Sequence, residues 1–145
     1  MSERPQSFEN HAMIVFGYHR LAIGLVVLLF GYYLFRATTD FSLDRLASLA
    51  LVIVVALVGL YARVFALGVQ DRVIRLEERL RMQRLFPTDL AGRIESFTTE
   101  QLIALRFASD AELVDLARRV LDERLADRKA IKRAIREWRA DNQRI

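Results

Sequence analysis

The sequence predicts an all-α protein: a two-helix transmembrane hairpin, a second span that continues as a long cytoplasmic helix, and a small helical module. Two apolar runs without any charged residue, Leu21 to Phe35 and Leu46 to Ala62, predict the hairpin. An uninterrupted helical pattern after the second run and a series of helix-capping signals predict the rest. We expect an N-terminal cytoplasmic segment over residues 1–17, the hairpin over 18–69 and the module over 70–145.

The two apolar runs are long enough to span a bilayer once their flanks are included. A spanning helix needs about 20 mostly apolar residues at about 1.5 Å per residue. Aromatic and arginine side chains next to each run suit the membrane interfaces, so we predict spans over about 18–37 and 46–67. A buried hairpin in a soluble core is the alternative, but the remaining chain is too small to cover two such helices. A cleaved signal peptide is disfavoured because no A-x-A pattern follows the first run.

The distribution of basic residues around the spans predicts the orientation. The loop between the spans holds Arg36 and Arg45, and the N-terminal flank holds Arg4 and Arg20. More arginines follow the second span, and the cytoplasmic side of a membrane protein carries the excess of Lys and Arg. We therefore expect both termini in the cytoplasm and a short outer loop of about ten residues. Small residues would let helices pack closely within the hairpin or between copies: Gly24, Gly31, Ala56, Gly59, Ala62 and Ala66.

The helix of the second span is expected to continue from about Leu46 to Leu85, where Pro87 stops it. Gly68 alone interrupts the pattern, at a cost of about 1 kcal/mol. The pairs Asp71–Arg75 and Glu77–Arg81 have the favourable i,i+4 order. Three interpretations compete for the apolar stripe of this helix: packing on the protein's own module, a short coiled coil with a second copy, or a basic face against anionic lipids. That stripe consists of Val69, Val73, Leu76 and Leu80.

The residues after Pro87 predict three or four short helices that must dock to be stable. Thr88 is an expected N-cap, and Thr98 with Gln101 forms a capping-box pattern. Ser109 with Glu112 forms a second such pattern, and Asp127 is positioned to cap a last helix. The apolar face of the helix after Ser109 holds Leu113, Leu116, Val120 and Leu121. We expect Ala130, Ile131, Ala134, Ile135 and Trp138 to face inward from the last helix.

Several long segments of the chain resemble an uncharacterised bacterial family of small two-span integral membrane proteins. The resemblance rests on QSFENH (Gln6–His11), QDRVIRLEERLRM (Gln70–Met82), TTEQLIALRFASDAEL (Thr98–Leu113) and IKRAIREWRADNQRI (Ile131–Ile145). It implies two N-terminal spans and a C-terminal helical region. It implies no activity, because the family has no established one.

The sequence offers no constellation for catalysis, metal binding or a cofactor. It contains no cysteine, and its two histidines, His11 and His19, have no accompanying carboxylate or third ligand. Net charge is +4, all of it from the part after residue 62, but acidic residues are mixed among the basic ones and disfavour a nucleic-acid partner. The basic residues expected to contact lipid headgroups or a partner are Arg63, Arg72, Arg75, Arg79, Lys132, Arg133 and Arg136.

These observations lead to the hypothesis of a membrane-anchored interaction or scaffold protein of the bacterial cytoplasmic (inner) membrane. Its expected partners are the lipid bilayer and either another protein or further copies of itself. An accessory subunit of a transporter or other membrane complex is the alternative. We expect no enzyme, no cofactor and no small-molecule substrate.

Overall fold

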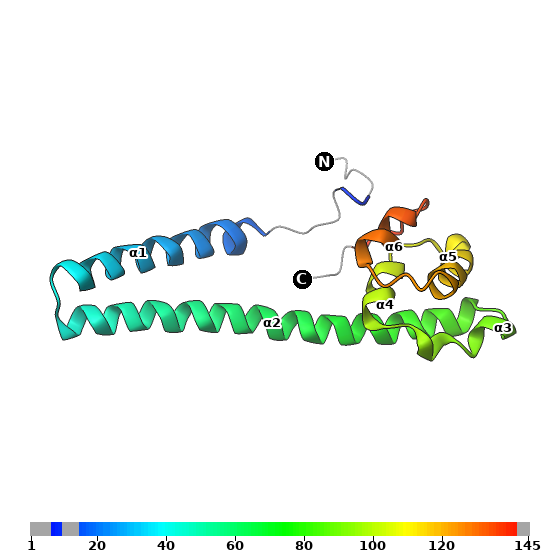
Figure 1. The fold of residues 1–145 in the computed structure, drawn as a ribbon, viewed down its shortest axis with the longest axis horizontal. Coiled ribbons are helices and arrows are strands. Elements are labelled where there is room, and N and C mark those ends of the chain that lie inside the picture. The colour runs from blue at the N-terminus through cyan, green and yellow to red at the C-terminus, as the bar shows by residue number, and fades with distance from the viewer. Residues whose placement is uncertain (1–6, 10–14, 142–145) are drawn as a thin grey trace. The chain divides into compact units, whose positions relative to one another are not determined.

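The computed structural model describes residues 7–9 and 15–141, and over these ranges the chain is helical without a regular β-strand. The all-α prediction is confirmed. The chain forms two compact units, which we call the hairpin unit (residues 13–67) and the module (residues 1–12 with 68–145). Figure 1 shows the order of the elements along the chain. Most of the predicted N-terminal segment, residues 1–17, lies outside the described residues.

The hairpin unit begins with a π-helical segment, η1 (Gly17–Ala22), which leads into α1 (Ile23–Thr39). The long helix α2 (Leu43–Leu85) then begins after only three residues, so the expected loop of about ten residues is wrong. The polar flank of the first run remains helical because the hydroxyls of Thr38 and Thr39 donate to the carbonyl of Phe35, at 2.8 and 3.0 Å. Ser42 then accepts from the backbone of Arg45 at 3.3 Å and starts α2.

Both candidate spans carry their apolar side chains on the outside. The helices Gly17–Thr39 and Leu43–Leu85 are each long and apolar enough to cross a membrane. Large side chains are largely exposed there, for example Leu28 at 70% and Phe35 at 63%. Within the hairpin unit the hydroxyl of Tyr18 donates to the carbonyl of Gly59 at 3.0 Å. The hairpin unit therefore presents a hydrocarbon surface, which is compatible with a bilayer.

The prediction of one helix running from the second apolar run to Leu85 is confirmed by α2, which spans 43 residues. Gly68 does not break it, because a single glycine costs only about 1 kcal/mol and Ala66, Leu67 and Gln70 around it are good helix formers. The helix ends just before Pro87, and the amide of Phe86 still bonds to the carbonyl of Met82 at 2.8 Å. Its C-terminal part, from Gly68 to Leu85, belongs to the module.

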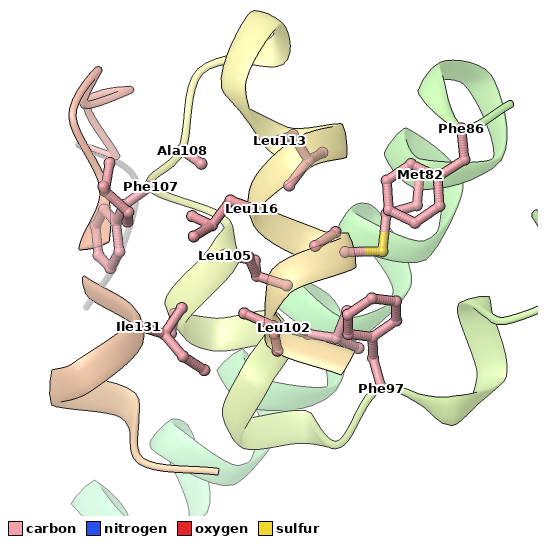
Figure 2. Close-up of a cluster of buried hydrophobic side chains, with 14 of the residues drawn as sticks. Met82, Phe86, Phe97, Leu102, Leu105, Phe107, Ala108, Leu113, Leu116 and Ile131 are labelled. Carbon is pink, nitrogen blue, oxygen red and sulfur yellow. The ribbon is translucent and has the colours of Figure 1, made fainter. Parts of the chain in front are cut away.

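The module encloses a single apolar core. Five short elements follow α2: α3 (Thr88–Ala91), the 3-10 turn η2 (Ile94–Ser96), α4 (Thr99–Leu105), α5 (Asp110–Asp122) and α6 (Arg128–Ala134). Figure 2 shows Met82 of α2 in one apolar cluster with Leu105 of α4 and Leu113 of α5, and all three side chains are fully buried. Burying each large side chain contributes about 1.5–3 kcal/mol, which short helices need to stay ordered.

Some of the helix caps predicted from the sequence are present in the module. Thr98 forms the complete capping box with Gln101, and Asp127 accepts from two backbone amides, so both predictions are confirmed. Ser109 caps α5 through the amide of Glu112 at 3.2 Å, but the Glu112 carboxylate does not complete a box and bonds elsewhere. Thr88 is not a cap, because Pro87 occupies the N-cap position of α3 and no side chain caps it.

The last helix is shorter than predicted. α6 ends at Ala134, and the chain continues extended through an antiparallel bridge between Ala108 and Trp138. The Glu112 carboxylate accepts from the amides of Arg136 and Glu137 at 2.9–3.0 Å, which satisfies them outside a helix. The predicted inward direction of Ile135 and Trp138 is nevertheless confirmed, since both pack on the core.

Candidate interaction surface

The part of α2 that belongs to the module has a covered face and an exposed face. Ile74, Glu78, Arg81 and Met82 are buried, with at most 6% of each exposed. At 3.6 residues per turn these four positions lie within about 100° of arc. The covered face therefore combines two apolar side chains with an ion pair, and Met82 joins the apolar core of the module.

The predicted apolar stripe lies on the opposite side of α2. Val69, Val73, Leu76 and Leu80 are between 47% and 61% exposed, and their centre is about 160° from that of the covered face. The interpretation that this stripe packs on the protein's own module is therefore wrong. Ile74 and Met82 are buried instead, and they lie on the same side of α2 as the Glu78–Arg81 pair, which the module holds through Asp110 and Ala108.

Arg81 connects the covered face to the start of α5. Its guanidinium donates to Glu78 at 3.1 Å, to Asp110 at 2.7 Å and to the carbonyl of Ala108 at 2.7 Å. Arg139 lies 3.6 Å from the other oxygen of Glu78. The predicted Glu77–Arg81 pair is wrong, because Arg81 points into the module while Glu77 remains exposed.

The buried charges are balanced within the cluster. Burial raises the pKa of Glu78 above its ordinary value of 4.5, and Arg81 opposes that rise through its charge and hydrogen bond. A buried pair with its hydrogen bonds satisfied adds little net stability, but removing one partner is costly. The cluster thus fixes how α2 seats on the module, which determines that the stripe faces outward.

The predicted basic contact residues fall into two groups. Some are engaged within the chain: Arg79 pairs with Glu95 at 2.8 Å, the Lys132 amine lies 4.8 Å from the Phe107 ring centre, and Arg133 lies over the ring of Phe8 at 5.3 Å. The others at the surface of the module are exposed, namely Arg72, Arg75 and Arg136. Arg63 lies in the hairpin unit and is partly buried.

The predicted helix-packing residues lie in the hairpin unit and leave space around them. Gly24, Ala56, Gly59 and Ala66 are partly buried, whereas Gly31 and Ala62 are exposed. A Cβ atom placed on Gly24, Gly31 or Gly59 would meet no other atom within 4 Å. Close approach inside this chain therefore does not require glycine at these three positions.

The histidine pair is not assembled within the described residues. The Nδ1 atom of His19 lies 3.1–3.2 Å from backbone atoms of Val15, one helical turn away. His11 lies outside the described residues. A shallow pocket of about 340 Å³ lies between α5 and the segment after α6, and Glu112 lines it with Arg119 and Arg136. The Glu112 carboxylate accepts from the backbone amides of Arg136 and Glu137, and Asp115 and Glu137 also line this pocket.

Sequence reasoning missed the cluster around Arg81. Asp110 is 29 residues from Arg81 and was recognisable only as a residue of the first turn of α5. The one local signal was the i,i+3 spacing of Glu78 and Arg81, which is common on exposed helix faces and does not indicate burial.

Comparison with known proteins identifies the family but no activity. Neither the curated proteins nor the solved structures yield a match. A family model described as a family of unknown function (DUF6526) matches residues 1–145. The chain therefore belongs to the family of unknown function DUF6526.

Proposed function

We propose that this protein is a membrane-anchored interaction protein of the bacterial cytoplasmic membrane. In this proposal the hairpin unit spans the bilayer over about 18–37 and 46–67, and the module recruits a protein partner on the cytoplasmic side. The observation that carries it is the exposed apolar stripe of α2, because the other large apolar side chains described in the module are buried or partly buried. A water-exposed apolar row of this kind is typical of a protein-binding surface.

Two further features support the membrane part of the proposal. Apolar side chains cover the outside of both candidate spans, where water would make such exposure unfavourable. Arginine is concentrated after the second span, which favours a cytoplasmic module and a cytoplasmic N-terminus.

A pair of reporter fusions tests the topology. A reporter active only outside the cytoplasm should be active when fused at Asp40, between α1 and α2, and inactive when fused after Ile145. Alkaline extraction should leave the protein in the membrane fraction. The reverse reporter pattern, or release into the soluble fraction, would contradict the proposal.

A photo-crosslinking experiment tests the interaction surface. A photoreactive residue in place of Leu76 should give a protein adduct in native membranes, because Leu76 is 61% exposed at the centre of the stripe. The matched control is Arg75, which is exposed on the same helix but lies outside the stripe. Equal labelling at both positions would show that the stripe has no preferred protein partner.

An accessory subunit of a larger membrane complex is the second candidate. The open space around Gly24 and Gly31 favours it, since an outside helix could approach α1 closely there. Gly24→Leu and Gly31→Leu should then reduce co-purification with the complex while leaving membrane insertion intact. Unchanged co-purification would exclude contact through these glycines.

A further inference from the structure

The exposed stripe of α2 has the spacing of a coiled-coil seam. Its residues are separated by 4, 3 and 4 positions, which places Val73 and Leu80 at heptad position a and Val69 and Leu76 at position d. We propose that the stripe is a homodimer interface, in which α2 packs against α2 of a second copy as a short parallel coiled coil. This inference rests on the proposed function and names the partner of the same surface.

The centre of the seam has the residue types of a two-stranded coiled coil. A β-branched residue at position a with leucine at position d is the combination that prefers parallel dimers, and Val73 with Leu76 provides it. The outer positions reverse it, with Leu80 at position a and Val69 at position d. In such a dimer each seam residue meets its own equivalent, so no complementary surface on a different protein is needed.

Membrane insertion fixes the direction of the two helices. All copies insert with the same topology, so two α2 helices that meet side by side must run in the same direction. A parallel seam related by a two-fold axis is therefore the arrangement that both copies can reach.

Charges beside the seam are complementary in this parallel arrangement. Arg72 occupies position g and Glu77 the following position e, which is the spacing of interhelical pairs in parallel dimers. Both side chains are exposed, so Arg72 of each copy would face Glu77 of the other. Arg79, the next g residue, would face Arg84 of the other copy, but Glu95 of its own chain already neutralises it at 2.8 Å.

A seam of two heptads is short for an isolated coiled coil, but two conditions lower the cost here. The helix is already held by the module, because Ile74 and Met82 bury its other face. The dimer therefore pays little of the entropy of helix formation. Anchoring in a bilayer also confines both copies to one plane, which raises their effective concentration.

Disulfide crosslinking of the full chain in native membranes tests the seam directly. The chain contains no cysteine, so each variant carries one thiol. We expect Val73→Cys and Leu76→Cys to form disulfide-linked dimers on mild oxidation. Arg75→Cys, an exposed control off the seam, should crosslink at least tenfold less. Equal or absent crosslinking at all three positions would overturn the homodimer.

A charge swap tests register and direction. Arg72→Glu and Glu77→Arg should each reduce the yield of the Leu76→Cys crosslink about fivefold, because two exposed pairs are lost per dimer. The combined swap should restore the yield. Failure of the combined swap to restore it would overturn the parallel register.

The outcomes separate this inference from the proposed function. A Leu76 photo-adduct with a different protein, together with absent cysteine crosslinks, would overturn the homodimer and leave the interaction module intact. A soluble protein, or a reversed topology, would contradict the proposed function itself. Labelling of lipid instead of protein at Leu76 would overturn the homodimer in favour of a lipid-contacting surface.

Discussion

In the hairpin unit large apolar side chains face outward, whereas in the module they are enclosed by short helices. Leu28 of α1 is 70% exposed, while Leu105 and Leu113 of the module are fully buried. The module also contains a buried charge. Arg81 lies on the covered face of α2, where it donates to two carboxylates and a backbone carbonyl. The two units therefore treat their apolar side chains differently: the hairpin unit leaves them on the outside, which is compatible with a bilayer, whereas the module encloses a core of its own.

The exposed stripe of α2 is the exception in the module. It has the outward apolar character of the hairpin unit, but it belongs to the unit that encloses its other large apolar residues. That contrast is the reason for assigning it an interface. Substitutions in the two units should therefore differ in their effect on stability.

The largest effect is expected from Arg81→Ala. The change leaves the buried Glu78 carboxylate without its main partner, which typically costs 3–5 kcal/mol, so we expect the module to lose about that much unfolding free energy. Fluorescence of Trp138, the single tryptophan, reports the unfolding in detergent because its ring packs 5.1 Å from that of Phe107. Arg75→Ala, an exposed control on the same helix, should change stability by less than about 0.5 kcal/mol.

A matched pair of leucine truncations compares the two units directly. Leu113→Ala should destabilise the module by about 2–5 kcal/mol, because it opens a cavity in a core where Leu113 is fully buried. Leu28→Ala should leave the denaturation of the module unchanged. Similar losses for both variants, measured by the same Trp138 transition, would show that the two units do not unfold independently.

A smaller effect is expected at the helix caps. Thr98→Ala removes the acceptor of the Gln101 amide and should cost about 1 kcal/mol. Thr88→Ala is the matched control, because Thr88 caps no helix, and it should be nearly neutral. Denaturant midpoints of the two variants provide the comparison, and equal midpoints would contradict the role of Thr98.

The smallest effect is expected in the pH dependence of the module. The folded state binds the Glu78 proton more tightly than the unfolded state, because the pKa is raised above 4.5. The contribution of Glu78 to stability therefore falls as pH rises through the unfolded and then the raised pKa. Arg81, Arg139 and Glu77 are the charged groups that act on Glu78.

Glu78→Gln isolates this effect because glutamine does not titrate. The stability of the natural chain relative to the variant should decline as pH rises above 4.5, the ordinary pKa of Glu78. A relative stability that rises over that range would show that Arg81 lowers the pKa of Glu78 instead of only limiting its rise. Thermal unfolding at matched pH values gives the measurement.

Local rules of the chain allowed much of the fold to be predicted. The continuous α2 follows from helical residues with one glycine and a terminal proline, and the caps at Thr98 and Asp127 follow from side chains that reach amides two or three residues away. The apolar face of α5 follows in the same way from its 3.6-residue period. These features depend on neighbours within a few positions.

Other features depended on contacts that no local pattern contains. The end of α6 at Ala134 was missed because Glu112, 24 residues before Arg136, takes up the amides that follow it. The shortened turn before α2 has a local cause instead, because the hydroxyls of Thr38 and Thr39 donate to the carbonyl of Phe35, three and four residues earlier. In each case a specific hydrogen bond overrode the average preference of the residue type.

Periodicity and charge-free length are properties of consecutive residues, and they were enough to predict the helical class, the two apolar helices and the continuity of α2. The face of α2 that the module covers depends instead on contacts between distant residues. Arg81 meets Asp110 and Ala108 at separations of 29 and 27 residues, and this meeting turns Ile74 and Met82 inward and the stripe outward. A helix with two apolar faces can bury either of them. In α2 the choice depends on Arg81, whose distant partners in the module satisfy its charge only when the face beside it is the buried one.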